Sequence, residues 1–340
     1  MAHPDVDNRT PFAFAPLFLT DEEARPVVVG LVKATFDFDS AGTVRRSPQQ
    51  DPVNLAGTPA TDAPVPSMRF EPEAVPCKLA TDVVLVGHAA PPGGGATQVD
   101  VGIKVGPVRK LARVFGTRFW VWTPQGVILT RTAALAEPVP LTWENAFGGL
   151  DVINSTPDRM LMEVRNPVGT GFGKPLRADG DRLRLPNIED PTNLIQAYGT
   201  AVPPCGFGFT SPNWQPRAAF GGTYDEQWTA TRKPLLPLDF DRRFFSAAAP
   251  GLVAPGFLRG DEDVVILNTT AGARVDFALP RVPPPLVRVV LRGGRDGVLR
   301  SALDTVVVDA DRQKVVLLWR TASVPGSPHD VTALAVAAEM

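Results

Sequence analysis

The residue best suited to acid–base chemistry in this sequence is His88, because the other histidines lie close to the chain termini. An imidazole titrates near neutral pH, so it can act as a general base in a hydrolytic reaction. Asp82 precedes His88 on the same expected strand, but this spacing holds the two side chains about 20 Å apart. A catalytic site would therefore need carboxylates from loops, and the candidates are Glu144, Asp151, Glu189 and Asp190. The simpler interpretation of His88 is a strand-end side chain bonded to a loop carbonyl.

Neighbouring acidic residues could supply oxygen ligands for a hard cation. The candidate pairs are Asp225 with Glu226, Asp239 with Asp241, and Glu189 with Asp190. None of them belongs to a loop of regularly spaced oxygen ligands, which a calcium loop requires. The two cysteines, Cys77 and Cys205, can form neither a disulfide framework nor a cysteine-based zinc site. The sequence therefore predicts no metal and no cofactor.

Charges alternate with aromatic rings between Asp239 and Phe245. Arg242 and Arg243 stand beside the acids, which favours ion pairs over metal binding. These pairs would frame a phenylalanine cluster that includes Phe244. We expect the cluster to be buried, because exposed aromatic side chains at this density favour self-association. If it were exposed, it would be a protein-binding surface.

Recognised catalytic motifs are absent from the sequence. It has no phosphate-binding loop, dinucleotide fingerprint, nucleophile elbow or paired-histidine zinc motif. The 34 Lys and Arg residues nearly balance the 36 Asp and Glu residues, which leaves a formal charge of −2. Since a neutral chain has no global attraction for phosphate groups, we expect neither nucleic acid nor a membrane as partner. The polar start of the chain lacks the features of a secretory signal, which predicts a cytoplasmic protein.

The elements that must position these residues are predicted to be β-strands. A hydrophobic fraction of 44% is enough for a sizeable core, while 30 Gly and 36 Pro spread along the chain disfavour long helices. Short alternating runs separated by turn residues are typical of an antiparallel β-sandwich. The expected strands are 27–38, 82–87, 98–106, 110–115, 118–122, 264–268, 274–279, 286–291, 305–309 and 314–319. One short helix is expected at 192–198, with Asp190 as its cap.

Four regions follow from this pattern. Residues 8–139 form an N-terminal β region, 140–260 a loop-rich middle segment packed on it, 261–322 a C-terminal β region, and 323–340 a tail. Within the first region, 47–76 is rich in proline and is expected to lie as an extended connection over a sheet. The middle segment has little periodicity, so we expect scattered aromatic side chains to anchor its loops. These anchors include Trp143, Phe147, Trp228, Phe240, Phe244 and Phe245.

Several blocks of the sequence resemble, in the same order, an uncharacterised-domain family encoded in bacterial type VI secretion loci. The blocks are NRTPF at 8–12, VKATF at 32–36, KLATDVVLVGHA at 78–89, WENAFGGLD at 143–151, NPVG at 166–169, LPNIEDP at 185–191, GTYD at 222–225 and DFDRRFF at 239–245. The resemblance covers roughly 8–320. It implies a non-catalytic adaptor or chaperone that helps load a secreted effector protein onto the spike or spike-tip proteins.

The residues in these blocks are candidates for structural or partner-binding roles, because the blocks are rich in Gly, Pro, Asn and aromatics rather than in nucleophiles. The candidates are Lys33, Thr81, Asp82, His88, Trp143, Glu144, Asp151, Asn166, Asn187, Glu189, Asp190, Tyr224, Asp225, Trp228, Asp239, Asp241, Arg242 and Phe244. The alternative to an adaptor is a hydrolase-like enzyme that uses His88 and loop carboxylates on a secreted or envelope component. The missing nucleophile motif favours the adaptor.

Overall fold

The fold is built almost entirely of β-strands, which confirms the all-β prediction. The computed structural model describes residues 4–91, 93, 95–156, 158–173, 176–294 and 296–338. Within these ranges the one α-helix is α1 (Glu226–Thr231), and short 3-10 helices occur at Trp143–Asn145, Arg217–Gly221, Arg242–Phe245 and Pro328–Asp330. None of the helices in the described ranges has the length and apolar character needed to cross a bilayer.

One main sheet, here called the first sheet, has the strand order β2–β3–β23–β22–β7, with β4 also paired to β3. Its strands are β2 (Ala13–Thr20), β3 (Pro26–Phe38), β23 (Lys314–Ser323), β22 (Ala302–Asp309), β7 (Asp82–Val86) and β4 (Val44–Arg46). All neighbours are antiparallel except β22 and β7, which run parallel. Strand β3 is buried over most of its length, as expected of a central strand rich in β-branched residues.

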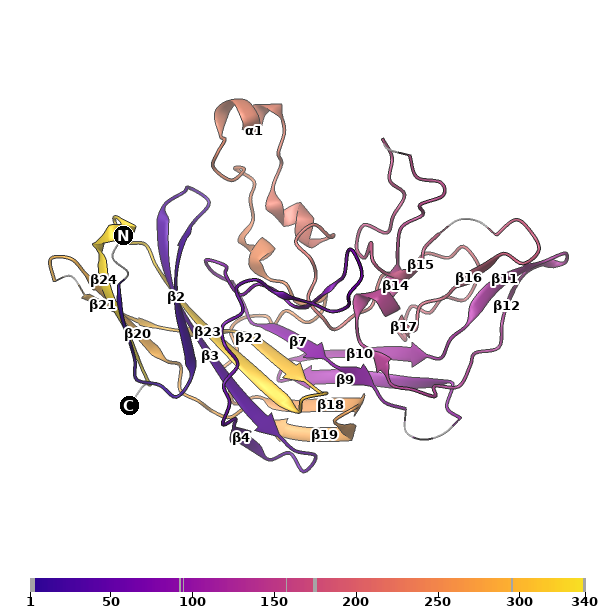
Figure 1. Ribbon diagram of the computed structural model, residues 1–340, viewed down its shortest axis with the longest axis horizontal. Helices are drawn as coiled ribbons and strands as arrows, with labels where there is room; N and C mark the ends of the chain where they lie inside the picture. Colours follow the sequence, from indigo (N-terminus) through magenta and orange to yellow (C-terminus); the bar gives the residue numbers. More distant parts are fainter. Residues whose placement is uncertain are drawn as a thin grey trace.

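The second sheet has the order β13–β8–β18–β9–β10–β17, with β19 also paired to β18. Its strands are β13 (Val139–Pro140), β8 (His88–Ala89), β18 (Asp263–Thr269), β9 (Gln98–Val105), β10 (Val108–Phe115), β17 (Ile188–Glu189) and β19 (Gly272–Ala278). One continuous hydrophobic cluster joins this sheet to the first, and Phe38 stacks on Phe277 with ring centroids 4.7 Å apart. Strands from both ends of the chain therefore share one core (Figure 1).

Smaller sheets surround this core. A four-stranded sheet has the order β1–β24–β20–β21, with β1 (Asp5–Asn8), β24 (Val331–Ala337), β20 (Leu286–Leu291) and β21 (Asp296–Arg300). Segment 323–340, expected as a tail, thus contains β24, whereas residues 339 and 340 lie outside the described residues. A three-stranded sheet has the order β12–β11–β16, with β12 (Gly126–Leu129), β11 (Phe119–Thr123) and β16 (Arg182–Arg184). Two further sheets have two strands each. One pairs β14 (Phe147–Gly148) with β15 (Thr170–Gly171), and the other pairs β5 (Thr58–Pro59) with β6 (Met68–Phe70).

The predicted helix at 192–198 is wrong, since this segment forms turns. The Asp190 carboxylate accepts hydrogen bonds from the backbone N–H and the hydroxyl of Thr192, and the Glu189 carboxylate accepts one from the N–H of Ile195. Side chains that bond to nearby backbone in this way compete with helical hydrogen bonds. The observed helix is α1, whose N-terminus is capped by Asp225 through a 2.8 Å bond from the N–H of Trp228.

The middle third forms loops, and two of them rise from the same side of the sheets. One joins β14 to β15, and the other carries α1 (Figure 1, top). Trp143 and Phe147 are buried, as the anchor hypothesis expects. The remaining anchors are only half-buried, namely Trp228, Phe240, Phe244 and Phe245. The phenylalanine cluster is therefore partly exposed, because it belongs to a loop that stands away from the core.

Gly148 lies where a side chain cannot fit. Its φ is +152°, and a Cβ there would come within 2.1 Å of the carbonyl oxygen of Asn166. We expect Gly148→Ala to lower the free energy of unfolding by more than about 4 kcal/mol, because backbone must move. Gly126→Ala is the matched control, since Gly126 also has a positive φ (+121°) but nothing within 4 Å. It should cost only about 1–2 kcal/mol. Urea denaturation of both variants measures the difference, and equal losses would contradict the steric argument.

Candidate functional site

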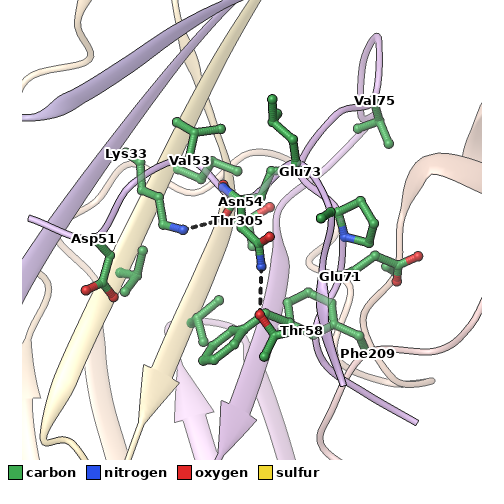
Figure 2. Close-up of a pocket in the computed structure, with 18 of the residues that line it drawn as sticks. Lys33, Asp51, Val53, Asn54, Thr58, Glu71, Glu73, Val75, Phe209 and Thr305 are labelled. Carbon is green, nitrogen blue, oxygen red and sulfur yellow. Dashed lines mark hydrogen bonds and ion pairs between the residues drawn. The ribbon is translucent and has the colours of Figure 1, made fainter. Parts of the chain in front are cut away.

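A cavity of about 580 Å³ lies between the first sheet and residues 51–75 (Figure 2). The proline-rich segment covers one face of β3, β22 and β23, as expected for an extended connection. Apolar walls come from Val53, Phe70, Val75, Phe209, Val307, Val316 and Leu318. Charged side chains from several parts of the chain lie among these apolar groups.

Lys33 and Glu73 form the ion pair at the centre of this cavity. Residues 51–75 are here called the covering segment. Lys33 projects from β3, and its Nζ lies 2.6 Å from Oε1 of Glu73 on this segment (Figure 2). The second carboxylate oxygen of Glu73 accepts a 2.7 Å bond from the N–H of Asn54. Both side chains are largely buried, so each charge depends on the other for compensation. The pair therefore ties the covering segment to the sheet.

A second ion pair joins Lys78 to Asp82. Nζ of Lys78 lies 2.7 Å from Oδ2 of Asp82 and donates a 2.8 Å bond to the hydroxyl of Thr305. The same Asp82 oxygen accepts a 2.8 Å bond from the N–H of Ala247. Since Asp82 is fully buried, these contacts to Oδ2 replace part of the hydration that its charge has lost, while its Oδ1 has no hydrogen-bond partner among the described residues.

Two further arginines of the lining, Arg217 and Arg320, pair with carboxylates. Arg217 pairs with Glu71 at 2.6 Å and also donates to the carbonyl oxygens of Thr210 and Phe244. Burial raises the pKa of Glu71, although Arg217 acts in the opposite direction. Arg320 pairs with Asp304 at 2.5 Å and donates to the carbonyl oxygen of Val75.

This cavity can hold a ligand, but its arrangement does not suit acid–base catalysis. Its charged groups bond to each other or to backbone, and no hydroxyl in the lining lies against a histidine. Within the described ranges, no three His, Cys, Asp or Glu side chains are placed to bind a metal ion. The chemistry that the cavity offers is therefore recognition and internal anchoring.

His88 bonds to a carboxylate rather than to a loop carbonyl. Its Nδ1 lies 3.0 Å from Oδ2 of Asp311, and its backbone N–H donates to the other oxygen. Thr270 donates to the same carboxylate at 2.6 Å. Burial raises the pKa of Asp311, but the bonds from Thr270 and His88 outweigh this effect and leave the pKa below its usual value. Sequence reasoning missed Asp311 because it comes from a turn more than two hundred residues away.

Of the four loop carboxylates considered for His88, the structure brings only Glu144 to the same pocket, a hollow of about 300 Å³. Both Glu144 oxygens are occupied, since they accept bonds from the N–H and the hydroxyl of Ser67. Asp151 binds Asn154 within its own loop, Glu189 pairs with Arg118, and Asp190 binds Thr192. No nucleophile among the described residues bonds to His88.

Most other candidates from the sequence blocks anchor turns. Asn166 donates to the carbonyl oxygens of Trp143 and Phe147, and Asn187 donates to that of Phe115. The Trp143 indole donates to the carbonyl oxygen of Phe209, and the Thr81 hydroxyl donates to that of Leu303. The Asp239 carboxylate accepts a bond from the Thr223 hydroxyl. Ion pairs join Asp241 to Arg243 and Arg242 to Glu22. Rings pack edge to face between Tyr224 and Trp228 and between Phe240 and Phe244. These contacts explain why the blocks contain Asn, Thr and aromatic residues.

The fold and its anchored loops define an all-β protein without a recognisable catalytic centre in the described residues. Residues 23–320 match a bacterial family described as "Uncharacterized protein conserved in bacteria (DUF2169)", and the chain belongs to that family. No curated protein and no solved structure matches the chain.

The Arg320–Asp304 pair provides a test of the buried charges. The two side chains are 4% and 2% exposed. We expect Asp304→Ala to lower the free energy of unfolding by about 3–5 kcal/mol, because Arg320 would keep a buried charge without its partner. The exposed Arg9–Asp7 pair is the control, and Asp7→Ala should cost less than about 1 kcal/mol. Chemical denaturation measures both variants, and a small loss for Asp304→Ala would show that the pair does not anchor the covering segment.

Proposed function

We propose that this protein is a non-catalytic adaptor or chaperone that helps load a secreted effector onto the spike or spike-tip proteins of a type VI secretion system. It acts in the bacterial cytoplasm before secretion. The resemblance of its sequence blocks to a family encoded in such loci supports the proposal. The family to which the chain belongs has no activity in its description.

The observation that carries this proposal is the exposure of large apolar side chains on the two loops that rise from the sheets. On the β14–β15 loop, Val152 is 72% exposed and Ile153 is 70% exposed. On the loop that carries α1, Leu238 is 84% exposed. Both loops rise from the same side of the sheets (Figure 1), and a contiguous apolar surface there would mark an interaction site. Packing in the core does not account for these exposed side chains, whereas a binding role does.

The α1 loop is held in position by ion pairs, which suits it for binding. Arg232 pairs with Glu23, and Arg242 pairs with Glu22, both in the turn that joins β2 to β3. An interface formed by loops that are already ordered loses less entropy on association. The exposed apolar side chains are therefore presented on a fixed support.

A hydrolase-like activity remains the second candidate, because His88 and Glu144 line one pocket and His88 pairs with Asp311. Its substrate would be a secreted or envelope component. Against it, Ser67 in that pocket donates its hydroxyl proton to Glu144 rather than to His88. An adaptor requires no such chemistry.

Capture of partners by purified protein tests the adaptor role. We expect the wild-type protein to retain the products of the neighbouring genes. The double variant Ile153→Asp, Leu238→Asp should reduce this retention at least about tenfold. Val298→Asp is the matched control, because Val298 is 63% exposed on β21, away from the two loops. It should leave retention unchanged. If the wild-type protein retains none of these products, the proposed function is wrong.

Substitution of His88 separates the adaptor from the enzyme. A general base contributes typically a hundredfold or more to a rate, whereas one half-exposed histidine contributes little to a large interface. We therefore expect His88→Ala to leave effector delivery into competitor cells near the wild-type level. Protein abundance and the amount of effector complex are measured alongside. A collapse of delivery with both at normal levels would establish the enzymatic alternative.

A further inference from the structure

The outer face of the second sheet carries exposed side chains that the fold itself does not need. Successive residues of a strand point to opposite faces, so the register assigns each side chain to one face. Val101, Ile103 and Val105 of β9 point into the core. Gly102 and Lys104 therefore lie on the outer face. Their neighbours across β10, β18 and β19 share that face.

Two rows of side chains cross this face. In one row the register aligns Leu111, Gly102, Leu267 and Arg274, and in the next it aligns Arg109, Lys104, Val265 and Asp276. The first row has an apolar centre, in which Leu111 is 41% exposed. The Leu111 side chain covers Gly102, since a Cβ there would come within 2.9 Å of Leu111 Cδ1. An open depression of about 550 Å³ lies among the side chains of these two rows.

The second row places two cations together. Lys104 and Arg109 are direct cross-strand neighbours, and both are exposed. Like charges in this position destabilise a sheet. In the described part of the chain neither of them has an ion pair, although Arg274 nearby pairs with Asp276 at 2.7 Å. A carboxylate from outside the chain would relieve the repulsion between the two cations.

We infer that this face, here called the basic face and formed by Lys104, Arg109, Leu111, Val265 and Leu267, binds an acidic segment of a partner protein. An apolar side chain of the segment enters the depression beside Leu111 and Leu267, and a carboxylate pairs with Lys104 and Arg109. Adjacent rows are two residues apart along a strand, roughly 7 Å. The segment therefore carries its apolar and acidic side chains two residues apart when it is extended.

Charge and shape favour a protein segment over other occupants. Nucleic acid would require a wider set of free cations, whereas the chain has a formal charge of −2 and the depression is apolar. A second copy of the chain would have to bring its own acidic and apolar residues in this spacing. Complementarity to both the cations and the depression identifies the partner as acidic and apolar. This inference deepens the proposed function, since it assigns a chemistry to one segment of the protein partner.

Binding of a designed probe tests the basic face independently of any secretion partner. The probe is a labelled, soluble peptide with Leu and Asp two residues apart, and its control has Lys in place of each Asp. We expect the full-length protein to bind the acidic peptide and not the control, with an affinity that falls as salt rises. Lys104→Glu with Arg109→Glu should weaken binding at least about tenfold, and Leu111→Ser should weaken it as well.

The matched control is Arg45→Glu with Arg46→Glu, which changes the net charge equally on exposed residues of β4 in the other sheet. It should bind the peptide as the wild-type protein does. Equal losses in both double variants, or no binding by the wild-type protein, overturn the inference. If DNA displaces the peptide, the basic face binds nucleic acid and the inference is wrong. If self-association of the chain displaces it, the face binds a second copy and the inference is again wrong.

The same double variants separate this inference from the proposed function. If the neighbouring gene products are captured equally by the wild-type protein and by the Lys104→Glu, Arg109→Glu variant, the adaptor role stands and the basic face is not its binding site. If the peptide binds as expected while no neighbouring gene product is captured, the basic face stands and the adaptor role is wrong.

Discussion

The buried carboxylate of Asp82 at the start of β7 joins three distant parts of this protein. It accepts bonds from Lys78, which also reaches Thr305 of β22, and from the backbone of Ala247 in the middle segment. A buried charge is costly unless it is paired and hydrogen-bonded, so these contacts favour the packing of the three segments against each other. The strand that follows Asp82 then pairs in parallel with β22. The first sheet is therefore completed by strands from both ends of the chain, and the cavity beside it forms where Lys78 and Thr305 meet the covering segment.

The strands that were predicted well are those with a clear alternation of apolar and polar residues or with a long apolar run. The range expected at 27–38 became β3, and the range expected at 286–291 became β20 with the same bounds. The expected helix at 192–198 failed because Asp190 and Glu189 bond to the backbone of that segment, and a single sequence does not show where Glu189 points. Strand β24 was missed because its pairing with β1 and β20 depends on partners far away in the chain.

The chemistry of the candidate site was harder to predict than the strands, because each important pair joins distant segments. Lys33 was recognised as part of a block, but its partner Glu73 lies in the proline-rich connection, which has no regular pattern. His88 was recognised as a candidate base, while Asp311 was not considered with it. Ion pairs between residues of such separation depend on strand order, which the pattern of a single sequence does not determine. The sequence blocks themselves were informative in a different way, since residues such as Asn166 and Thr81 hold loops by bonding to backbone carbonyls.

The contrast between inside and outside indicates how this architecture works. Inside, the charged side chains around the cavity pair with other residues of this chain, and these pairs hold the covering segment on the first sheet. Outside, Ile153 and Leu238 expose apolar area that the core does not use, and Lys104 and Arg109 carry neighbouring charges without a carboxylate in the described residues. A protein gains nothing for its own stability from either feature. Both features would become favourable if another molecule covered them, and the binding role proposed above rests on them.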